Sequence, residues 1–354
     1  MDKVRVAVVG ATGMVGQRFV KLLENHSMFE LVALTASPAS VGKRYSEAAH
    51  WYVEGQMPEG VAEMKVSTDD PNWLKALGVE VAFTALPAEV ALKVEPELAK
   101  AGINVLSDAS TFRMEKDVPV LIPEVNPEHL KLLEVQRRRR GWRGCIITNP
   151  NCTTTVLVMS LKPLLDNFGV KRVIVSTMQA VSGAGWGGVP SMAIIDNVIP
   201  YIAKEEEKVE AESLKILGSL NQGEVKAANF KISASCHRVN VLDGHLEAVF
   251  VELGKAVEAV EVINAMKNFK GKPQELKLPT APQQPIIVKD EPDRPQPRFD
   301  RYAGGGMSVA VGRVRRDPAI ENGVKYVVLG HNTIRGAAGN SVLNAELLVK
   351  EGLL

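Results

Sequence analysis

The first part of the chain alternates two hydrophobic patterns. Short runs rich in valine, isoleucine and leucine predict buried strands, and the segments between them carry apolar residues at helical spacing. This alternation is typical of a parallel sheet whose crossovers are helices, so it predicts a doubly wound α/β domain. Strands are expected at residues 4–9, 31–35, 79–84, 103–106 and 145–148, and helices at 15–25, 88–100 and 128–138.

The pattern changes after Cys152. A long apolar helix is expected at residues 153–168, followed by strand-like stretches at 172–179, 231–242 and 245–253. Strands that follow one another without intervening helices indicate an antiparallel or mixed sheet. The second part of the chain is therefore expected to be an α+β domain with a mixed sheet.

The last hundred residues predict two further features. Residues 282–298 are rich in proline, which favours an extended, ordered arm over a helix. Residues 333–350 have the pattern of a helix that could return to the first domain. The expected domains are thus residues 1–151, completed by 332–354, and residues 152–331.

Composition excludes several classes of protein. The chain has 354 residues, enough for about two domains. Its 42 Lys and Arg nearly balance its 41 Asp and Glu, so no global field would draw it to nucleic acid or to an anionic membrane, and neither is expected as a partner. With 45% hydrophobic and 23% charged residues, the chain is globular and not disordered.

Neither an export signal nor a metal site is expected. The strand at residues 4–9 follows Met1 after two residues, without the long apolar core or cleavage site of a signal peptide. No run of about 18 apolar residues is present. Cys145, Cys152 and Cys236 are too few and too scattered for a disulfide framework or a zinc site. The sequence therefore favours a cytoplasmic protein without a bound metal.

A glycine-rich turn follows the first strand. Residues 10–16 read Gly-Ala-Thr-Gly-Met-Val-Gly and open the first predicted helix. Free N–H groups at a helix start favour a pyrophosphate, and glycine lets that group approach the backbone. The spacing departs from G-x-G-x-x-G, and a tight turn without a ligand is the alternative. Its place at the start of a βαβ unit favours a dinucleotide and a domain of the Rossmann type.

The loop after the second strand bears on which dinucleotide binds. An Asp or Glu usually meets the free ribose 2′-hydroxyl about 20 residues beyond the glycines. Here Ser37 and Ser40 occupy that loop, with Lys43 and Arg44 just beyond. Hydroxyl and cationic groups suit a 2′-phosphate, so the sequence favours NADP(H) over NAD. A simple polar loop is the alternative.

Cys152 has the surroundings of a nucleophile. It follows Pro150 and Asn151, which are helix start signals, and precedes the long apolar helix. The positive end of a helix dipole is expected to lower the pKa of the thiol, and nearby N–H groups could stabilise an oxyanion. Cys145 and Cys236 lie in strand-like apolar runs and are expected to be inert. A buried cysteine that only fills space is the alternative for Cys152.

His245 is the histidine with the most informative neighbours. Asp243 and Gly244 separate two strand-like runs, which is a signal for a two-residue hairpin. Such a turn would pair Leu242 with His245 and place Arg238 on the same face as the imidazole. An arginine there could bind a carboxylate through two parallel hydrogen bonds. A surface hairpin with a chemically idle histidine is the alternative.

Six motifs occur in order along the chain: residues 10–16, 107–114, 149–152, 179–185, Arg238 with His245 seven residues later, and 332–339. Together they resemble the aspartate-β-semialdehyde dehydrogenases of the archaeal and fungal-like branch, over essentially the whole chain. The resemblance implies an N-terminal NADP-binding domain and a second domain for catalysis and dimerisation, in a homodimer or homotetramer. It implies NADPH-dependent conversion of L-aspartyl-4-phosphate to L-aspartate-4-semialdehyde and phosphate, in lysine, threonine and methionine biosynthesis.

The resemblance also implies roles for individual residues. Cys152 would attack the acyl phosphate to give a thioester that accepts hydride, His245 would act as general acid/base, and Gln179 would orient the acyl group. Arg238 would bind the substrate α-carboxylate and Glu205 its ammonium. The phosphate would be bound by Ser110, Arg113, Asn151 and Lys208. The cofactor would be bound by Gly10, Thr12, Gly13, Met14, Val15, Ser37, Ser40, Ser182, Gly183 and Asn332.

Two points stay open within this resemblance. Glu206 or Glu207 could bind the ammonium in place of Glu205, and the whole segment could be an exposed charged helix. Asp108 departs from the family pattern, and a second carboxylate beside a phosphate site is expected to point away.

Three other functions remain in view. A malonyl-CoA reductase would also form a cysteine thioester and use NADPH, but its substrate has no acyl phosphate for Arg113 to bind. A reductase of N-acetylglutamyl phosphate would leave Glu205 without an ammonium partner. A catalytically silent NADP-binding protein would bind the cofactor without acylation of Cys152.

Overall fold

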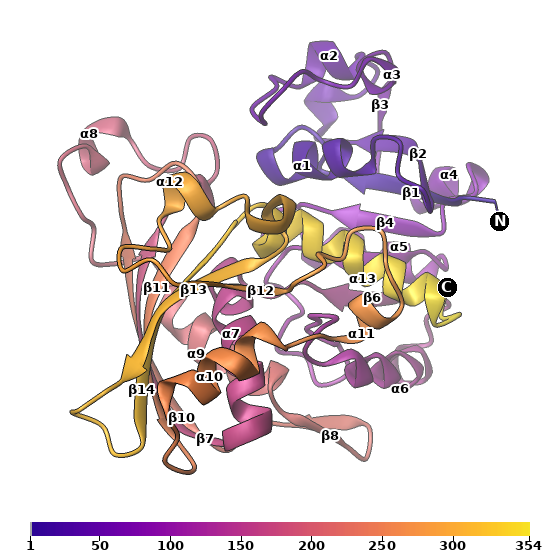
Figure 1. Cartoon of the computed structure of the whole chain (residues 1–354). Helices are drawn as coiled ribbons and strands as arrows, with labels where there is room; N and C mark the ends of the chain where they lie inside the picture. Colours follow the sequence, from indigo (N-terminus) through magenta and orange to yellow (C-terminus); the bar gives the residue numbers. More distant parts are fainter. Residues whose placement is uncertain (1) are drawn as a thin grey trace.

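The computed structural model describes residues 2–354, which form two parts joined side by side (Figure 1). Met1, which is separated from the first predicted strand by two residues, lies outside the described residues. Among residues 2–354, no helix is long and apolar enough to cross a membrane.

The N-terminal part contains a six-stranded sheet in the order β3-β2-β1-β4-β5-β6. All its strand pairs are parallel, and the predicted doubly wound fold is confirmed. Its strands are β1 (Val4–Val9), β2 (Phe29–Thr35), β3 (Val66–Ser67), β4 (Val81–Thr84), β5 (Asn104–Ser107) and β6 (Cys145–Thr148). Only β3 was not predicted, because two residues are too short to show a period.

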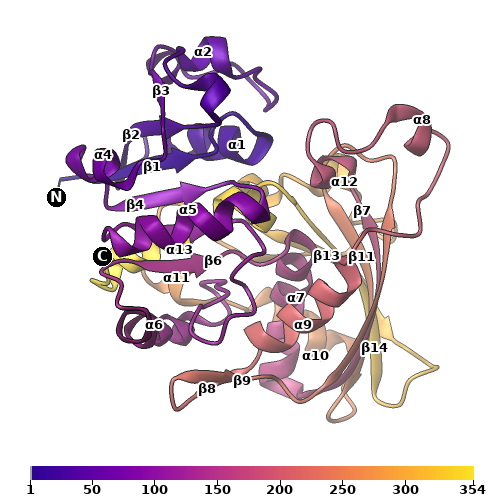
Figure 2. The same ribbon diagram turned by 180° about the vertical axis from the view of Figure 1, so that it is seen from behind.

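Helices cover both faces of this sheet. They are α1 (Met14–Leu23), α2 (Tyr45–Ala48), α3 (Glu59–Ala62), α4 (Pro71–Ala76), α5 (Ala88–Lys100), α6 (Leu132–Arg140) and the C-terminal α13 (Gly339–Lys350). Helices α1 and α13 pack with Val6 and Val8 on one face, whereas α4 and α5 pack with Ala7 and Val9 on the other. Figure 2 shows α5 in front of the sheet and α13 behind it. The predicted return of the C-terminal helix to the first sheet is therefore confirmed.

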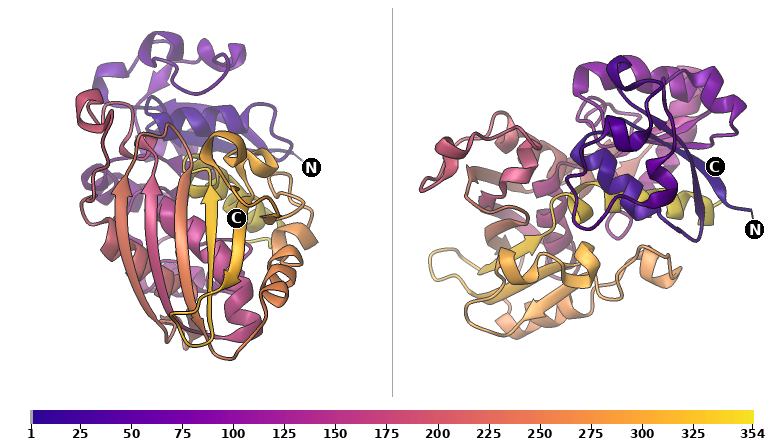
Figure 3. Two further views of the ribbon diagram at one scale, coloured as in Figure 1. Left: turned by 60° about the vertical axis from the view of Figure 1, so that its left-hand side comes forward. Right: turned by 90° about the horizontal axis from the view of Figure 1, so that it is seen from above.

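The second part contains a mixed sheet in the order β10-β7-β11-β14-β13-β12, as predicted in type. Its strands are β7 (Val170–Gln179), β10 (Lys231–Arg238), β11 (His245–Leu253), β12 (Ile286–Lys289), β13 (Val309–Arg316) and β14 (Gly323–Gly330). The strands β12 to β14 were not predicted. The helices α7 (Cys152–Phe168), α9 (Glu205–Ile216) and α10 (Ala259–Lys267) pack on one face of the sheet, and the opposite face is in front in the left view of Figure 3.

Short elements complete the second part. They are α8 (Ser191–Ile194), α11 (Lys272–Glu275), α12 (Pro297–Asp300) and the two-stranded β8 (Ser219–Asn221) and β9 (Glu224–Lys226). Single helical turns lie at Pro38–Ser40, Pro127–Lys131, Val181–Ala184, Ala303–Gly306 and Ile334–Ala338, the last labelled η5. The proline-rich arm contains β12 and the start of α12, and is otherwise extended or turned, in line with its composition.

The predicted hairpin at Asp243 and Gly244 is wrong. Strands β10 and β11 do not pair, because β7 lies between them, parallel to β10 and antiparallel to β11. Leu242 lies outside both strands, and His245 opens β11. The Asp-Gly signal marks a reversal of the chain but cannot say which strand fills the neighbouring position.

Candidate active site

Cys152 is the first residue of α7, as the helix start signals predict. Asn151 caps this helix, since its side-chain oxygen accepts hydrogen bonds from the N–H groups of Thr153 at 3.0 Å and Thr154 at 3.1 Å. Those two N–H groups are therefore already paired and are not free oxyanion donors, contrary to the simplest sequence expectation. Cys152 keeps partial exposure beside a cavity of about 760 Å³.

The sulfur of Cys152 lies 3.2 Å from Nε2 of His245. On its other side, the imidazole accepts a hydrogen bond at Nδ1 from the Ala180 N–H, at 3.1 Å. A backbone N–H can only donate, so in the neutral ring the proton resides on Nε2. We infer that His245 is arranged to donate from Nε2 toward the sulfur and toward groups bonded to it.

The electrostatics of this pair differ from the sequence expectation. Burial raises the pKa of the Cys152 thiol to about 12, and the Glu205 carboxylate raises it further. Arg113, the Thr153 N–H and Arg238 lower it, but burial outweighs them. The prediction of a lowered thiol pKa is therefore wrong for the substrate-free protein.

His245 is also neutral in this state. Burial lowers its pKa to about 3, and the nearby Arg238 and His331 add to the shift. The resting pair therefore consists of a neutral thiol and a neutral imidazole.

Three strand ends place further polar groups around this pair. Arg238 ends β10 and lies opposite Gln179, which ends β7, while the next strand β11 begins at His245. Nη1 of Arg238 donates to the Ala180 carbonyl at 2.7 Å. The predicted closeness of Arg238 and His245 is confirmed, although β7 and not a hairpin brings them together.

Gly183 lies against these groups. A Cβ on Gly183 would be 2.9 Å from Nη1 of Arg238 and 3.2 Å from Cε1 of His245. The absence of a side chain therefore allows the 181–184 turn to approach both groups closely.

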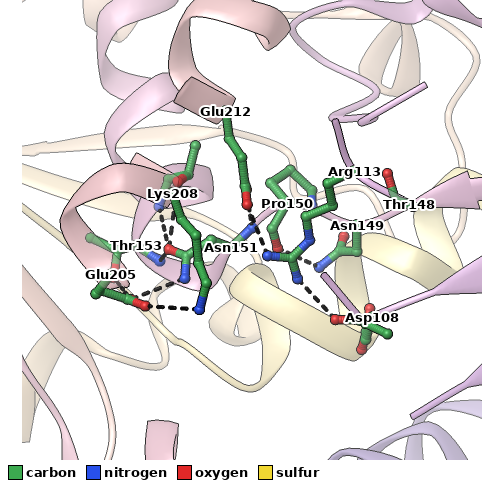
Figure 4. A network of polar contacts seen from close by, with 12 residues as sticks. Asp108, Arg113, Thr148, Asn149, Pro150, Asn151, Thr153, Glu205, Lys208 and Glu212 are labelled. Carbon is green, nitrogen blue, oxygen red and sulfur yellow. Dashed lines mark hydrogen bonds and ion pairs between the residues drawn. The ribbon is translucent and has the colours of Figure 1, made fainter. Parts of the chain in front are cut away.

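Helix α9 provides charged groups close to Asn151, the residue before Cys152 (Figure 4). Glu205 accepts hydrogen bonds from Nδ2 of Asn151 at 3.0 Å and from the Thr153 hydroxyl at 3.3 Å, and Lys208 lies 3.8 Å from its other oxygen. Of the open alternatives, Glu206 accepts the Cys236 N–H and Glu207 is exposed. Glu205 is the glutamate of the three that lines the cavity.

Arg113 reaches the same region from the loop after β5. Its Nη1 lies 3.0 Å from Oε1 of Glu212, and its Nη2 donates to the Asp108 carbonyl at 2.9 Å. The Asp108 side chain accepts the Ser341 hydroxyl at 2.7 Å and makes no side-chain pair with Arg113, although Asp108 is among the residues that line the cavity. Burial raises the pKa of Asp108 to about 7.

Most of the predicted site residues meet in the cavity of about 760 Å³. Five of the predicted site residues, His245, Gly10, Thr12, Ser37 and Ser40, are not among the lining residues, although His245 contacts the sulfur of Cys152. The lining residues to which the sequence assigned a role are Gly13, Met14, Val15, Ser110, Arg113, Asn151, Cys152, Gln179, Ser182, Gly183, Glu205, Lys208, Arg238 and Asn332.

The glycine turn fits a dinucleotide. Gly13 caps α1 without a side-chain hydrogen bond, so the amides of the first turn are open toward the cavity. Gly10 has a positive φ of 86°, and a Cβ there would lie 2.5 Å from the Ala85 carbonyl oxygen. The turn is bonded to the end of β2, since the Gly10 N–H donates to the Thr35 carbonyl two residues before Ser37.

Asn332 joins the C-terminal segment to this region. Its Nδ2 donates to the Ser182 hydroxyl at 2.8 Å, and its Oδ1 accepts the Gly244 N–H at 2.9 Å. Residues from three distant parts of the chain thus meet at one wall of the cavity.

Comparison with known proteins identifies the family. Residues 5–133 match the model "Semialdehyde dehydrogenase, NAD binding domain", and residues 161–335 match "Semialdehyde dehydrogenase, dimerisation domain". An aspartate-semialdehyde dehydrogenase of Methanothermobacter thermautotrophicus is 58% identical over 98% of this chain and 99% of its own. The chain belongs to the semialdehyde dehydrogenase family.

Two further relatives refine this membership. The crystal structure of aspartate semialdehyde dehydrogenase with NADP from Candida albicans matches with a TM-score of 0.91 and 40% identity, over 100% of both chains. A malonyl CoA reductase (NADP) of Metallosphaera sedula is 41% identical over 99% of this chain and 98% of its own. The expected family, its archaeal and fungal kinship and a nicotinamide dinucleotide cofactor are confirmed, and the malonyl-CoA enzyme is less similar to this chain than the Methanothermobacter enzyme is.

No role was predicted from the sequence for two residues that the structure places in this site of the semialdehyde dehydrogenase. Glu212 binds both Arg113 and the backbone of Asn151, and Gly336 lies against Cys152. The spacing of Glu205, Lys208 and Glu212 along one helical face was a usable signal for the first. Gly336 lies within the 332–339 motif, but nothing in that motif relates it to Cys152, which is 184 residues earlier in the chain.

Proposed function

We propose that the protein is an aspartate-semialdehyde dehydrogenase that reduces L-aspartyl-4-phosphate to L-aspartate-4-semialdehyde with NADPH and releases phosphate. The observation that carries this proposal is the Cys152–His245 pair, with 3.2 Å between Sγ and Nε2. The pair lies beside a cavity that holds both a dinucleotide turn and an arginine suited to an anionic leaving group. Covalent catalysis needs these groups within reach of one carbonyl.

The chemistry begins with attack of the Cys152 sulfur on the acyl carbon. The carbon–oxygen bond to phosphate breaks, a thioester forms, and the thiol proton balances the charge of the departing phosphate. Reduced nicotinamide, when bound, supplies the hydride that converts the acyl group to the aldehyde level. His245 then donates a hydrogen bond from Nε2 to the sulfur as the carbon–sulfur bond breaks, while its Nδ1 stays on the Ala180 N–H. The proton that restores the thiol enters from solvent by way of Nε2, because the neutral ring carries only one proton.

The two charged groups on the α-carbon of the substrate are assigned to two different side chains of the cavity. Arg238 would bind the α-carboxylate through its guanidinium, and Glu205 would bind the ammonium. Gln179, between Arg238 and His245, would orient the acyl oxygen. The phosphate would meet Arg113, Lys208, Ser110 and Asn151.

The cofactor-binding residues also remain proposals. Ser37 and Ser40 would contact the 2′-phosphate of NADP(H). The first turn of α1 would hold the pyrophosphate. The remaining contacts would come from Gly10, Thr12, Gly13, Met14, Val15, Ser182, Gly183 and Asn332.

Malonyl-CoA reduction is the second candidate, since a relative at 41% identity carries that name. The phosphate-side groups favour the aspartyl substrate. Arg113 and Lys208 both line the cavity at Cys152, and a thioester substrate would offer no phosphate at the reacting carbon for them to neutralise.

The deciding experiment is an assay of NADP reduction with aspartate semialdehyde, with and without inorganic phosphate. We expect phosphate-dependent turnover, none in Cys152→Ala, and a rate lower by roughly 10²–10⁴-fold in His245→Asn. Cofactor binding should persist in Cys152→Ala, because only the nucleophile is lost. Turnover of malonyl-CoA without phosphate-dependent oxidation of the semialdehyde would contradict the proposal.

The organisation of the molecule is part of the same proposal. We place the cofactor domain at residues 1–151 with 332–354, and the catalytic and dimerisation domain at 152–331. Residues 161–335 match a dimerisation-domain model, which supports a homodimer or homotetramer. A cytoplasmic location is proposed because Cys152 must stay a thiol, and all three cysteines are free.

A further inference from the structure

Besides Glu205 and Lys208, helix α9 carries a third charged group toward the site, and the proposed mechanism does not use it. Glu212 is 2% exposed and lies two turns after Glu205. Its Oε1 lies 3.0 Å from Nη1 of Arg113, and its Oε2 accepts the backbone N–H of Asn151 at 2.6 Å. One buried carboxylate thus touches both the proposed phosphate-binding arginine and the residue just before the nucleophile (Figure 4).

We propose that Glu212 is a positioning residue that fixes the leaving-group site and the nucleophile relative to each other. The inference rests on the proposed function only in assigning phosphate to Arg113. Glu212 itself would not touch the substrate, and it acts through the arginine and through the cap of α7.

The contact between Glu212 and Arg113 sets the orientation of the guanidinium group. Glu212 holds Nη1 of Arg113, and the Asp108 carbonyl holds Nη2. Each of these nitrogens keeps one further N–H, and Nε of Arg113 has no partner among residues 2–354, so the guanidinium plane is fixed while donors remain for an anion. The carboxylate also balances a cation that is 7% exposed and would otherwise be buried without an ionic partner.

The same Glu212 side chain also fixes the backbone just before the nucleophile Cys152. Asn151 is held at its N–H by Glu212, and at its side chain by Glu205 and by the first amides of α7. Cys152 follows directly, so the position of its sulfur depends on this cap. A small displacement here would be costly, because a misplacement of about 1 Å can lower a rate by roughly 10²-fold.

Glu212→Gln tests the proposal, with Glu207→Gln as the matched control on the exposed face of the same helix. The amide can still accept from Asn151, but its NH₂ group opposes Nη1 of Arg113. We expect Glu212→Gln to raise the KM for phosphate by about tenfold or more, because Arg113 turns away, and to leave the KM for NADP unchanged. Glu207→Gln should match the parent protein in both constants.

A double-mutant cycle separates positioning from a general structural role. In an Arg113→Gln background, Glu212→Gln should have little further effect on the KM for phosphate, since its route through the arginine is already removed. If the two substitutions have fully additive effects on the KM for phosphate, Glu212 does not act through Arg113 and the proposal is wrong. If Glu212→Gln does not fold, Glu212→Asp keeps the charge but is too short to hold both partners, and it should show the same rise.

Two readouts are independent of turnover. Calorimetric titration with inorganic phosphate should show weaker binding in Glu212→Gln, and iodoacetamide should alkylate Cys152 at a changed rate. If both match Glu207→Gln, the inference fails. If the parent protein does not oxidise aspartate semialdehyde but the two readouts still separate the variants, the proposed substrate fails and the role of Glu212 stands.

Discussion

At the residue scale, the state of the Cys152 thiol is the property that most affects reactivity. Burial raises its pKa to about 12, so the thiolate fraction at neutral pH is very small and increases with pH. We expect the alkylation rate of Cys152 in the substrate-free protein to rise about tenfold per pH unit from about pH 7 to about pH 10. The measurement is iodoacetamide labelling followed by mass spectrometry, with Cys152→Ala reporting the background from Cys145 and Cys236. A rate that is already level near neutral pH would show a preformed thiolate and contradict this prediction.

The same residue shows the limit of local sequence signals. Pro150 and Asn151 correctly predict a helix that starts at Cys152. They cannot give the balance between the helix dipole and burial, because the residues that bury the sulfur come from other segments. Glu205 and His245 are 53 and 93 residues away in the sequence. The position of Cys152 at the start of a helix was therefore predictable from the sequence, whereas the ionisation state of its thiol was not.

At the scale of elements, α9 also anchors the loop that carries Arg113. Lys215 donates from Nζ to the carbonyls of Arg113, Glu115 and Val118 at 2.6, 2.7 and 2.8 Å. Lys215→Met should lower the free energy of unfolding by about 2–4 kcal/mol, since each buried carbonyl left unpaired costs about 1–3 kcal/mol and some would be rehydrated. Urea denaturation measures the loss.

A matched control exists on another helix. Lys267 lies in the last turn of α10, is half-exposed and makes only a surface ion pair with Asp290. Lys267→Met should change stability by less than about 1 kcal/mol. Equal losses for Lys215→Met and Lys267→Met would show that the three carbonyl contacts contribute nothing measurable.

The elements also show which part of the fold follows from pattern. Strands β1 and β6 were predicted to the residue, because buried runs in a parallel sheet are short and bounded by clear breaks. The pairing of β10 with β11 was mistaken, since the strand between them, β7, comes more than fifty residues earlier in the chain. Local turn chemistry specifies a reversal, and the order of strands in a sheet is decided by packing across the whole chain.

At the scale of the whole molecule, the C-terminal segment ties the two parts together at the nucleophile. Arg335 of η5 forms a fully buried bidentate pair with Glu124, with contacts of 2.9 and 2.6 Å. The next residue, Gly336, lies against Cys152, and its carbonyl accepts Nδ2 of Asn149 at 3.2 Å. The segment that follows the second sheet therefore supports the back of the catalytic cysteine before α13 returns to the first sheet.

This closeness makes Gly336 a test of the whole arrangement. A Cβ at Gly336 would lie 2.7 Å from Cβ and 2.9 Å from Cα of Cys152, and these atoms cannot rotate away as the end of a flexible side chain could. Gly336→Ala should therefore displace the sulfur from His245 and lower kcat by roughly 10²-fold, while overpacking lowers stability by about 1–3 kcal/mol. The measurements are steady-state kinetics and thermal denaturation, with Gly60→Ala, where a Cβ meets no atom within 4 Å, as the control. If Gly336→Ala keeps kcat within about threefold of the parent, η5 does not position the nucleophile, and the link between the C-terminal return and catalysis is lost.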